Sequence, residues 1–447
     1  MVILQARSSP VTIFEGGRLI AGDGRPPIER AAFVVENGRV RQVGAQGSIQ
    51  APPGARRVDL TGKTVMPALV DAHVHLGYRS GTTFTAQNYT RANLLDELDR
   101  FAYYGVAAVL EAGTGRGVLP FAIRGETESG GLKPAPAGAR LLTAGRGFAM
   151  PNAGPGVPMR DAPYGVTSED DAHRDVRELA ASRPDMIKIW VDDRGGTVEK
   201  LKPNLYRAII DEAHAHGIRV MAHIAALEDA KDLLRAGVDG FGHVVRDKDI
   251  DQELIAMLHE RPRVFFTATL WGERNAIYGR KPDWLEEPLV RETLSEAEIA
   301  SLAAGFSTGP ATMSDSGRRL LRNVSALNRA GVALALGTDT GGVTGGGYFG
   351  LASLVELELL VKAGMTPAQA LAAGTRTSAA VLGLDGLGTI AAGKSASFIV
   401  LDANPLDGIA NVRRIGAVYL DGVEVNRAAL RNRWTAQSVQ NAEVRRN

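Results

Sequence analysis

The sequence predicts an α/β fold: a central domain of alternating strands and helices, with a small β domain built from both chain ends. Apolar segments of strand length recur through the middle of the chain, and helical patterns separate many of them. The flanks lack this alternation and carry hairpin signals instead. The 447 residues accommodate one barrel of about 250 residues with additions. The alternation favours a parallel barrel over an open sheet, although the strand count alone does not decide between them.

The two chain ends predict the composite β domain. Residues 10–64 read as short strands, with Asn37-Gly38 as a strong hairpin signal between two apolar runs. Residues 385–425 have the same character, with a turn at Asp421-Gly422. We therefore predict two domains, a β-sandwich of residues 1–64 plus 385–447 and a barrel of residues 65–384.

Eight apolar segments are the predicted strands of the central domain: Val65–Val70, Val106–Leu110, Arg140–Thr143, Met186–Val191, Ile218–Ala222, Val238–Phe241, Val264–Thr267 and Val332–Leu336. Helices are predicted between them where apolar residues recur at helical spacing before a glycine that can end the helix. The clearest are Asn93–Tyr104, Leu205–His216 and Leu227–Ala236. Thr366-Pro367 begins a further helix as N-cap and first-turn proline.

Composition excludes several classes of function. Lys and Arg number 51 against 50 for Asp and Glu, so a net charge of +1 gives no field for nucleic acid or an anionic membrane. The absence of cysteine excludes a thiolate nucleophile, a disulfide and any Cys-ligated metal. No signal peptide or 18-residue apolar span is visible. We expect a cytoplasmic protein, although an exported enzyme without its signal peptide would read the same.

The first chemical signal is His73-Val74-His75, directly after the first of these strands. Residues two apart on a strand share a face, so both imidazoles can point into one cavity and hold a divalent metal. Lys188 lies within the strand Met186–Val191, where an ammonium group is buried and must find a partner or change its pKa. This lysine is either paired with a carboxylate or chemically altered or catalytic.

Three more candidate ligands lie at strand ends. His223 follows one predicted strand, and His243 ends the next strand after a single βα repeat. Asp339 follows the last predicted strand of the central domain. Each residue alone has an ordinary interpretation as a loop or helix cap. Together with the earlier three they form a set at the C-terminal strand ends, where parallel barrels build their active sites.

Six segments together resemble the amidohydrolase superfamily, and within it the imidazolonepropionase-like and prolidase-like branch of metal-dependent hydrolases. They are VMPALVDAHVHL (65–76), DMIKIW (185–190), VMAHIAALEDAKDLLRAGVDGFGH (220–243), ALGTDTGG (335–342), GMTPAQALAAGTRTSAAVLGL (364–384) and GTIAAGKSASFIVLDANPL (388–406). The resemblance covers most of the chain in the right order. It implies a (β/α)8 TIM barrel with the composite β domain, and it is compatible with a homo-oligomer.

The resemblance also implies a binuclear metal centre. The ligands of one ion would be His73, His75 and Asp339, those of the second His223 and His243, and the bridge would be Lys188 carboxylated by CO2 or bicarbonate. Nitrogen and oxygen ligands favour zinc, with manganese, cobalt or nickel as alternatives. A hydroxide bridging the two metals would attack an amide bond, with Asp339 as general base and then acid.

The predicted substrate is a small-molecule amide: an N-acyl amino acid, a dipeptide of the Xaa-Pro type or a related compound. A mononuclear deaminase or cyclic amide hydrolase, or a lactone, carbamate or phosphoester hydrolase on the same centre, is the alternative. A non-catalytic scaffold is disfavoured because the ligand set is complete. Glu111 replaces an aspartate common in the family after the second strand. The candidate substrate contacts at or beyond strand ends are Tyr78, Trp190, Arg194, Arg246 and Tyr348.

Overall fold

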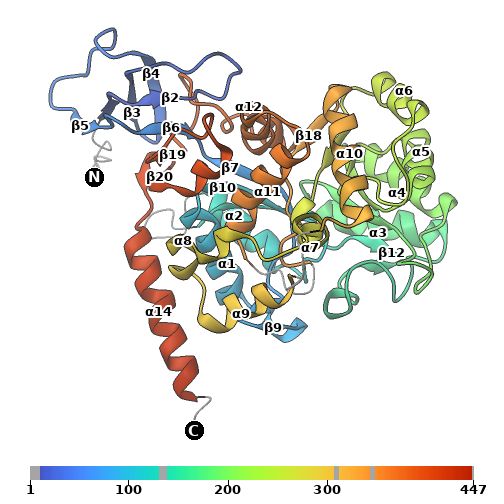
Figure 1. Ribbon diagram of the computed structural model, residues 1–447. Helices are drawn as coiled ribbons and strands as arrows, with labels where there is room; N and C mark the ends of the chain where they lie inside the picture. Colours follow the sequence, from blue (N-terminus) through green and yellow to red (C-terminus); the bar gives the residue numbers. More distant parts are fainter. Residues whose placement is uncertain (1–10, 130–137, 307–311, 343–347, 445–447) are drawn as a thin grey trace, which may run out of the picture.

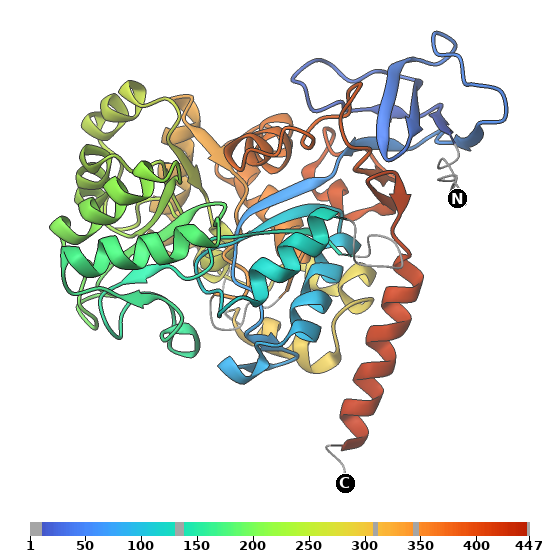
Figure 2. The same cartoon turned by 180° about the vertical axis from the view of Figure 1, so that it is seen from behind.

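The structure is a computed structural model that describes residues 11–129, 138–306, 312–342 and 348–444. Parallel strands form its centre, and helices lie outside them (Figures 1 and 2). Strands from both chain ends lie together at one side of this α/β body, beside the long C-terminal helix. The predicted α/β class is therefore confirmed.

The central strands form two sheets in which all neighbours are parallel, with orders β11-β10-β7 and β13-β12-β14-β15-β16-β17-β18. The strands are β7 (Leu69–Val74), β10 (Val106–Glu111), β11 (Arg140–Thr143), β12 (Phe148–Ala149), β13 (Tyr164–Gly165), β14 (Ile187–Val191), β15 (Val220–Ile224), β16 (Gly240–Phe241), β17 (Phe265–Thr267) and β18 (Ala333–Ala335). Seven of the eight predicted segments each correspond to one of these strands.

The eighth predicted segment, Val65–Val70, was wrong as a single strand. It divides at Ala68 into β6 (Thr64–Pro67), which pairs with a C-terminal strand, and β7, which joins the parallel sheet. Both halves are buried, so continuous apolar character could not reveal the change of sheet.

Backbone hydrogen bonds link the two parallel sheets. The Ala72 N–H donates to the Leu336 carbonyl at 2.8 Å, which makes β7 and the end of β18 neighbours. The Asp185 N–H donates to the Thr143 carbonyl at 3.0 Å, which joins the end of β11 to the approach to β14. The strand ends that carry the predicted ligands therefore face a common region.

The helices follow the patterns expected from their sequence. The predicted helix Leu227–Ala236 has those bounds and ends at Gly237, whose φ of 100° is accessible to glycine without strain. Thr366 caps its helix in a capping box with Gln369. The helices are α1 (Arg91–Tyr103), α2 (Leu119–Ser129), α3 (Glu169–Ala181), α4 (Pro203–Ala215), α5 (Leu227–Ala236), α6 (Gln252–Glu260), α7 (Arg274–Tyr278), α8 (Pro288–Arg291), α9 (Glu296–Ala304), α10 (Asp315–Arg329), α11 (Leu351–Lys362), α12 (Pro367–Ala372), α13 (Ser378–Val381) and α14 (Arg427–Val444), with a 3-10 turn η3 (Leu270–Glu273) after β17.

Two further sheets contain the terminal strands, in the orders β4-β3-β1-β5 and β2-β6-β19-β20-β21. The strands are β1 (Thr12–Glu15), β2 (Arg18–Leu19), β3 (Ala31–Glu36), β4 (Arg39–Ala45), β5 (Arg56–Asp59), β19 (Phe398–Leu401), β20 (Ile415–Leu420) and β21 (Val423–Glu424). The second sheet combines both chain ends, and the β3–β4 hairpin turns at Asn37-Gly38 as predicted. Phe14 of the first sheet packs on Phe398 and Tyr419 of the second, at 5.1 Å between ring centroids in both cases.

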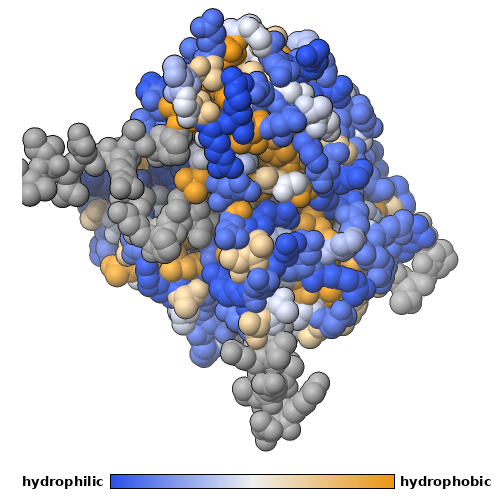
Figure 3. Space-filling view, turned by 90° about the vertical axis from the view of Figure 1, so that its left-hand side faces the viewer, coloured by the Kyte–Doolittle hydropathy of each residue, from blue (hydrophilic) through white to orange (hydrophobic). Residues whose placement is uncertain are grey.

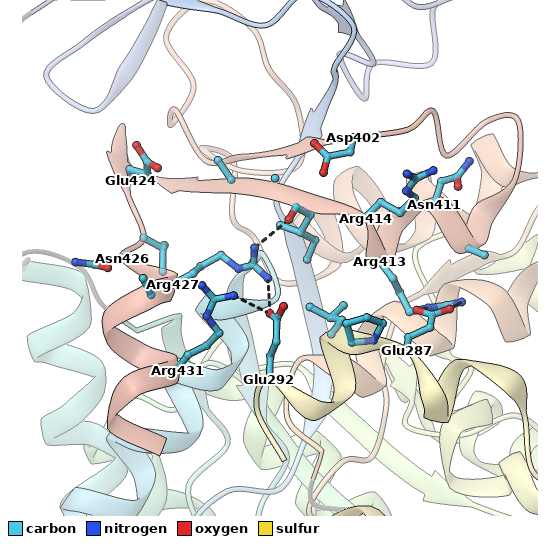
Figure 4. A pocket seen from close by; sticks show the side chains of 18 residues that line it. Glu287, Glu292, Asp402, Asn411, Arg413, Arg414, Glu424, Asn426, Arg427 and Arg431 are labelled. Atoms are coloured by element: carbon cyan, nitrogen blue, oxygen red, sulfur yellow. Dashed lines mark hydrogen bonds and ion pairs between the residues drawn. The ribbon is translucent and has the colours of Figure 1, made fainter. Parts of the chain in front are cut away.

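The last described element is α14, a helix absent from the sequence prediction. Trp434 attaches it to the body: its ring lies 5.4 Å from that of Tyr103, and its Nε1 donates to Asp96 at 2.7 Å. An open groove of about 1070 Å³ lies at the base of this helix, between α8 and β20 (Figure 4). Arg431 in this groove pairs with Glu292 at 3.2 Å. None of the predicted site residues is among the described residues that line it.

The face in Figure 3 is mainly hydrophilic, with hydrophobic residues in small patches between polar ones. Among the described residues, no helix combines the length and the apolar character that a membrane span needs.

Candidate metal centre

The end of β7 places two imidazoles side by side. His73 and His75 are almost completely buried, and their ring centroids are 5.3 Å apart. His73 Nδ1 bonds to the Gly242 carbonyl at 2.8 Å, and His75 Nδ1 to the Thr114 hydroxyl at 2.9 Å. The Nε2 atoms of the two rings lie 3.5 and 3.1 Å from Asp339 Oδ1. One nitrogen of each ring is therefore anchored, and the other faces a shared carboxylate.

Lys188, the second residue of β14, reaches this pair. Its side chain is fully buried, and its Nζ lies 3.1 Å from His73 Nε2. Burial lowers the pKa of Lys188 to about 7, opposed by the charge of Asp339 and aided by that of Arg194. This lysine therefore loses its proton near neutral pH, unlike a solvated lysine.

His223 and His243 lie at the ends of β15 and β16, with ring centroids 4.2 Å apart. His223 Nε2 bonds to Asp192 Oδ2 at 3.0 Å, which leaves its Nδ1 for another partner. His243 Nδ1 lies 2.8 Å from the Thr269 hydroxyl, which leaves its Nε2. A metal-ligating histidine typically has this arrangement, because a bond at one nitrogen fixes the tautomer and orients the other.

Burial favours the neutral form of His73, His223 and His243. It lowers the pKa of His223 to about 3, and it moves the pKa values of His73 and His243 well below the ordinary range. Neutral imidazole is the form that binds metals. The potential ligand atoms of His73, His243 and Asp339 all lie within 4.8 Å of one another. Lys188 contacts His73, His75 contacts Asp339 and His223 packs against His243, so each of the other three predicted ligands lies against this group.

Asp339 enters the cluster from a strained backbone. It follows β18 with a φ of 56°, and Thr269 beside His243 has a φ of 50°. Positive φ is costly for a β-branched residue such as threonine, and such strain concentrates at functional sites. Burial alone would raise the pKa of Asp339, but the hydrogen bond from His75 and the nearby charge of Lys188 hold it below its ordinary value. The carboxyl is therefore ionised at neutral pH.

Glycine makes room for the lysine head group. A Cβ at Gly242 would lie 2.6 Å from Lys188 Nζ and 2.9 Å from the His73 ring. Such distances are far below normal contact, so the close approach of β16 to the cluster requires glycine.

Three buried carboxylates bond to residues that hold the cluster in place, and their roles were not predicted from the sequence. Glu111 accepts both the N–H and the hydroxyl of Thr114, the residue that bonds His75. Asp71 accepts the Thr338 N–H and hydroxyl at 3.1 and 2.9 Å, and burial raises its pKa to about 7. Glu356 is the third. A carboxylate inside an otherwise apolar strand or helix is the sequence signal that could have identified all three.

Glu356 projects from α11 and accepts the backbone N–H groups of Leu270 and Trp271 at 2.8 and 2.6 Å. Burial raises its pKa to about 8. These bonds hold the first turn of η3 directly after Thr269, so Glu356 supports the backbone that carries the His243 partner.

The candidate substrate contacts have different surroundings. Tyr78 is fully buried and donates its hydroxyl to the Thr114 carbonyl, while Tyr348 donates to the Glu298 carbonyl. Trp190 is buried, with its ring centroid 5.6 Å from Lys188 Nζ. Arg194 and Arg246 are partly exposed next to the cluster, and substrate binding by all five stays a prediction.

The sequence model of the amidohydrolase family matches residues 64–425, which include all six cluster residues. The chain belongs to the amidohydrolase family. Amidohydrolases generally use metal ions, in agreement with the buried donors at His73, His243 and Asp339. The imidazolonepropionase and prolidase-like branch expected from the sequence is confirmed.

This amidohydrolase is 28% identical to imidazolonepropionase from Cereibacter sphaeroides over 402 residues, 85% of this chain and 90% of the relative. It superposes on a structure from Bifidobacterium longum, provisionally assigned as a prolidase, with a TM-score of 0.72 and 26% identity over 96% of this chain and 99% of the other. A Xaa-Pro dipeptidase structure gives a TM-score of 0.72 at 22% identity, over 93% and 99%. The chain is an enzyme of this class, a hydrolase acting on carbon–nitrogen bonds.

Proposed function

We propose that this amidohydrolase uses a binuclear metal centre to cleave the amide bond of an N-acyl amino acid, a dipeptide of the Xaa-Pro type or a related small molecule. The observation that carries the proposal is the orientation of the four imidazoles. Each has one ring nitrogen bonded to an outer partner, and the other nitrogen is left for the cluster that includes Lys188 and Asp339. The free donors would be Nε2 of His73, His75 and His243 and Nδ1 of His223.

The donor set fits divalent metals, most simply zinc. All donors are nitrogen or oxygen, and the chain has no cysteine. Lys188 would complete the set: its neutral amine adds to CO2, forms a carbamate with the loss of one proton, and gains two oxygen donors. When bound, the two ions would polarise the scissile carbonyl and lower the pKa of the attacking water.

Asp339 would move the proton in this reaction. Its ionised carboxylate can accept the proton of the attacking water and pass it to the nitrogen of the departing amine. Asp339 Oδ1 lies 3.1 Å from His75 Nε2 and 3.5 Å from His73 Nε2, so the carboxylate is already beside two of the proposed donor nitrogens. The Asp339 side chain is 11% exposed, so bulk water has little access to compete for that proton.

A (β/α)8 barrel is part of the same proposal. The backbone hydrogen bonds between β7 and β18 and between β11 and the approach to β14 support closure of the two parallel sheets into one ring. Residues 65–384 would form this barrel, and residues 1–64 and 385–447 the composite β domain. The cytoplasmic location and the homo-oligomeric state stay predictions.

A mononuclear centre is the second candidate. The group of His73, His243 and Asp339 alone brings its ligand atoms within 4.8 Å, and one ion would suffice for a deaminase or cyclic amide hydrolase. A lactone, carbamate or phosphoester substrate is compatible with either centre.

A hydrolysis screen tests the proposal. Protein of measured metal content, supplied with bicarbonate, is assayed with N-acyl amino acids, Xaa-Pro dipeptides, lactones and carbamates. Hydrolysis of amides, nearly abolished by Asp339→Asn at unchanged metal content, is the expected result. Turnover of esters or carbamates alone, or full activity of Asp339→Asn, would contradict the proposal.

A further inference from the structure

A stiff loop, residues 150–163, connects the neighbouring strands β12 and β13. Its ends lie side by side, because the Tyr164 N–H donates to the Gly147 carbonyl at 2.8 Å and the Val166 N–H to the Ala149 carbonyl at 3.0 Å. Its prolines are Pro151, Pro155, Pro158 and Pro163. Because proline fixes φ, this loop has few alternative conformations, and contacts at a few points determine where all of it lies.

The middle of this loop lies beside the proposed metal centre. A Cβ at Gly154 would lie 3.5 Å from the Trp190 ring, whose centroid is 5.6 Å from the Nζ of the proposed bridging lysine. Two residues later, a Cβ at Gly156 would lie 3.8 Å from the Gly342 carbonyl oxygen. Gly342 in turn lies against a proposed ligand, because a Cβ there would lie 2.6 Å from Asp339 Oδ1. A single residue therefore separates the loop from the proposed ligands on each side, and the loop forms one wall beside them.

Arg194 holds the part of the loop that lies beside the centre. It follows β14, and its Nε and Nη2 both donate to the Gly154 carbonyl at 3.2 and 2.9 Å. Hydrogen bonds from a charged donor are roughly twice as strong as neutral ones, so this attachment is firm. Two other arginine contacts, of Arg146 with the Ala162 carbonyl and of Arg116 with Asp161, lie at the opposite end of the loop. Arg194 therefore determines where Gly154 and the residues next to it lie.

The backbone of Arg194 has an unusual conformation. Its φ is 53°, a left-handed value that few residues other than glycine adopt. The Arg194 N–H donates to Asp192 Oδ1 at 3.0 Å, and Asp192 Oδ2 bonds the proposed ligand His223 at 3.0 Å. Such conformations persist only where surrounding contacts hold them, and they concentrate at functional sites. The side chain that holds the loop thus belongs to the same network as a proposed metal ligand.

We propose that Arg194 is a positioning residue: through the Gly154 carbonyl it fixes the 150–163 loop as one wall of the substrate site. The substrate then binds to an enzyme in which this wall is already in place. Binding against a loop that is held in advance avoids the free-energy cost of ordering the loop. The inference rests on the proposed amide hydrolysis, and it gives Arg194 a role that differs from the direct substrate contact predicted from the sequence.

Hydrogen exchange separates the two roles of Arg194 without any substrate. Mass spectrometry follows amide exchange in peptides that cover residues 150–163 of the free, zinc-loaded enzyme. We expect this exchange to be about tenfold faster or more in Arg194→Met, because a hydrogen bond from a charged donor has a contribution of that size. Exchange should be intermediate in Arg194→Lys, which keeps one charged donor for the Gly154 carbonyl. Unchanged exchange in Arg194→Met would overturn the inference.

Substrate binding gives the second measurement, with N-acetylleucine and the dipeptide leucyl-proline as probes. Their dissociation constants are measured by calorimetry on zinc-loaded Asp339→Asn protein, in which hydrolysis is blocked, and leucine release by enzyme with Asp339 intact gives KM and kcat. The apparent dissociation constant rises as the fraction of binding-competent enzyme falls. In Arg194→Met, the dissociation constant and KM should therefore rise by about tenfold or more, while kcat stays within threefold and the zinc content is unchanged.

Arg261→Met is the matched control, because Arg261 also donates to a glycine carbonyl, that of Gly237 at the end of α5, at 2.9 Å. This variant should change neither the exchange of residues 150–163 nor KM. A raised dissociation constant in Arg194→Met without faster exchange of the loop would show direct contact with the substrate and overturn the inference. Faster exchange with a dissociation constant within threefold of normal, or no binding of either probe, would overturn it as well. Binding that depends on Arg194 as expected, without hydrolysis of either probe, would instead refute the proposed amide hydrolysis alone.

Discussion

Asp192 offers a sharp test of how the metal ligands are oriented. Its Oδ2 lies 3.0 Å from His223 Nε2, and its Oδ1 accepts the Arg194 N–H at 3.0 Å. Burial alone would raise the pKa of Asp192, but the hydrogen bond from His223, with the N–H and the charge of Arg194, hold it below its ordinary value. The ionised carboxylate fixes the His223 ring with its Nδ1 turned toward the cluster. Replacing Asp192 by Ala removes that constraint without removing a ligand.

The expected loss follows from the chemistry of this one contact. A hydrogen bond to a charged group contributes about 1.5–3 kcal/mol, which corresponds to about a 10- to 150-fold change in an equilibrium constant. Loss of such an outer partner typically weakens metal binding by about 10- to 100-fold. We therefore expect zinc affinity to fall by about that factor in Asp192→Ala, and by less in Asp192→Asn, which keeps an acceptor oxygen.

Competition with a chromophoric chelator measures this affinity, and circular dichroism checks that the variant is folded. Asp239→Asn is the matched control: Asp239 bonds His214 Nε2 at 2.8 Å in a pair of similar chemistry at the surface. This control should bind zinc like the unmodified enzyme. A folded Asp192→Ala protein whose zinc affinity lies within threefold of normal would refute the orientation argument.

Three further predictions concern the cluster and its support. Gly242→Ala would place a Cβ 2.6 Å from Lys188 Nζ. The amount of bound metal, measured by plasma mass spectrometry, should therefore fall. An unchanged metal content would contradict the packing argument. Because burial lowers the pKa of Lys188 to about 7, its amine is protonated below that pH and free above it. Reactivation by zinc at fixed dissolved CO2 should therefore rise through pH 7 and level off near pH 8; a rise only near pH 10 would show an ordinary lysine. Glu356→Ala leaves two buried N–H groups without acceptors, so the free energy of unfolding, measured in urea, should fall by about 2–5 kcal/mol. The fall should be smaller for Glu356→Gln. An unchanged free energy of unfolding would count against the role of Glu356 in holding η3.

Strand positions were predictable from sequence because local patterning determines them. The segment Arg140–Thr143 has the predicted bounds, and α5 begins and ends as expected. The change of sheet at Ala68 was not predictable, because residues on both sides are equally buried and only long-range pairing distinguishes them. Helix α14 escaped prediction because the buried residues of its described side chains are one pair, Leu430 and Trp434, which is too short an apolar stripe to predict a helix.

The residues of the candidate site, like the elements of the fold, were only partly predictable from the sequence. His73 and Lys188 could be proposed from sequence because strand alternation places their side chains on the inner face. The supporting carboxylates could not, because their partners lie far away in the chain: Asp71 bonds Thr338, and Glu356 bonds the start of η3. The contact of the Tyr78 hydroxyl was not predictable either, because its hydrogen bond to the Thr114 carbonyl depends on a loop conformation that has no local sequence signal.

The number of metal ions per chain tests the central claim most directly. Enzyme reconstituted with excess zinc and bicarbonate, freed of unbound metal, is analysed by plasma mass spectrometry together with Lys188→Ala. We predict two zinc ions per chain, with a fall to one or fewer in the variant. A single zinc ion per chain in the fully active enzyme, unchanged by Lys188→Ala, would contradict it.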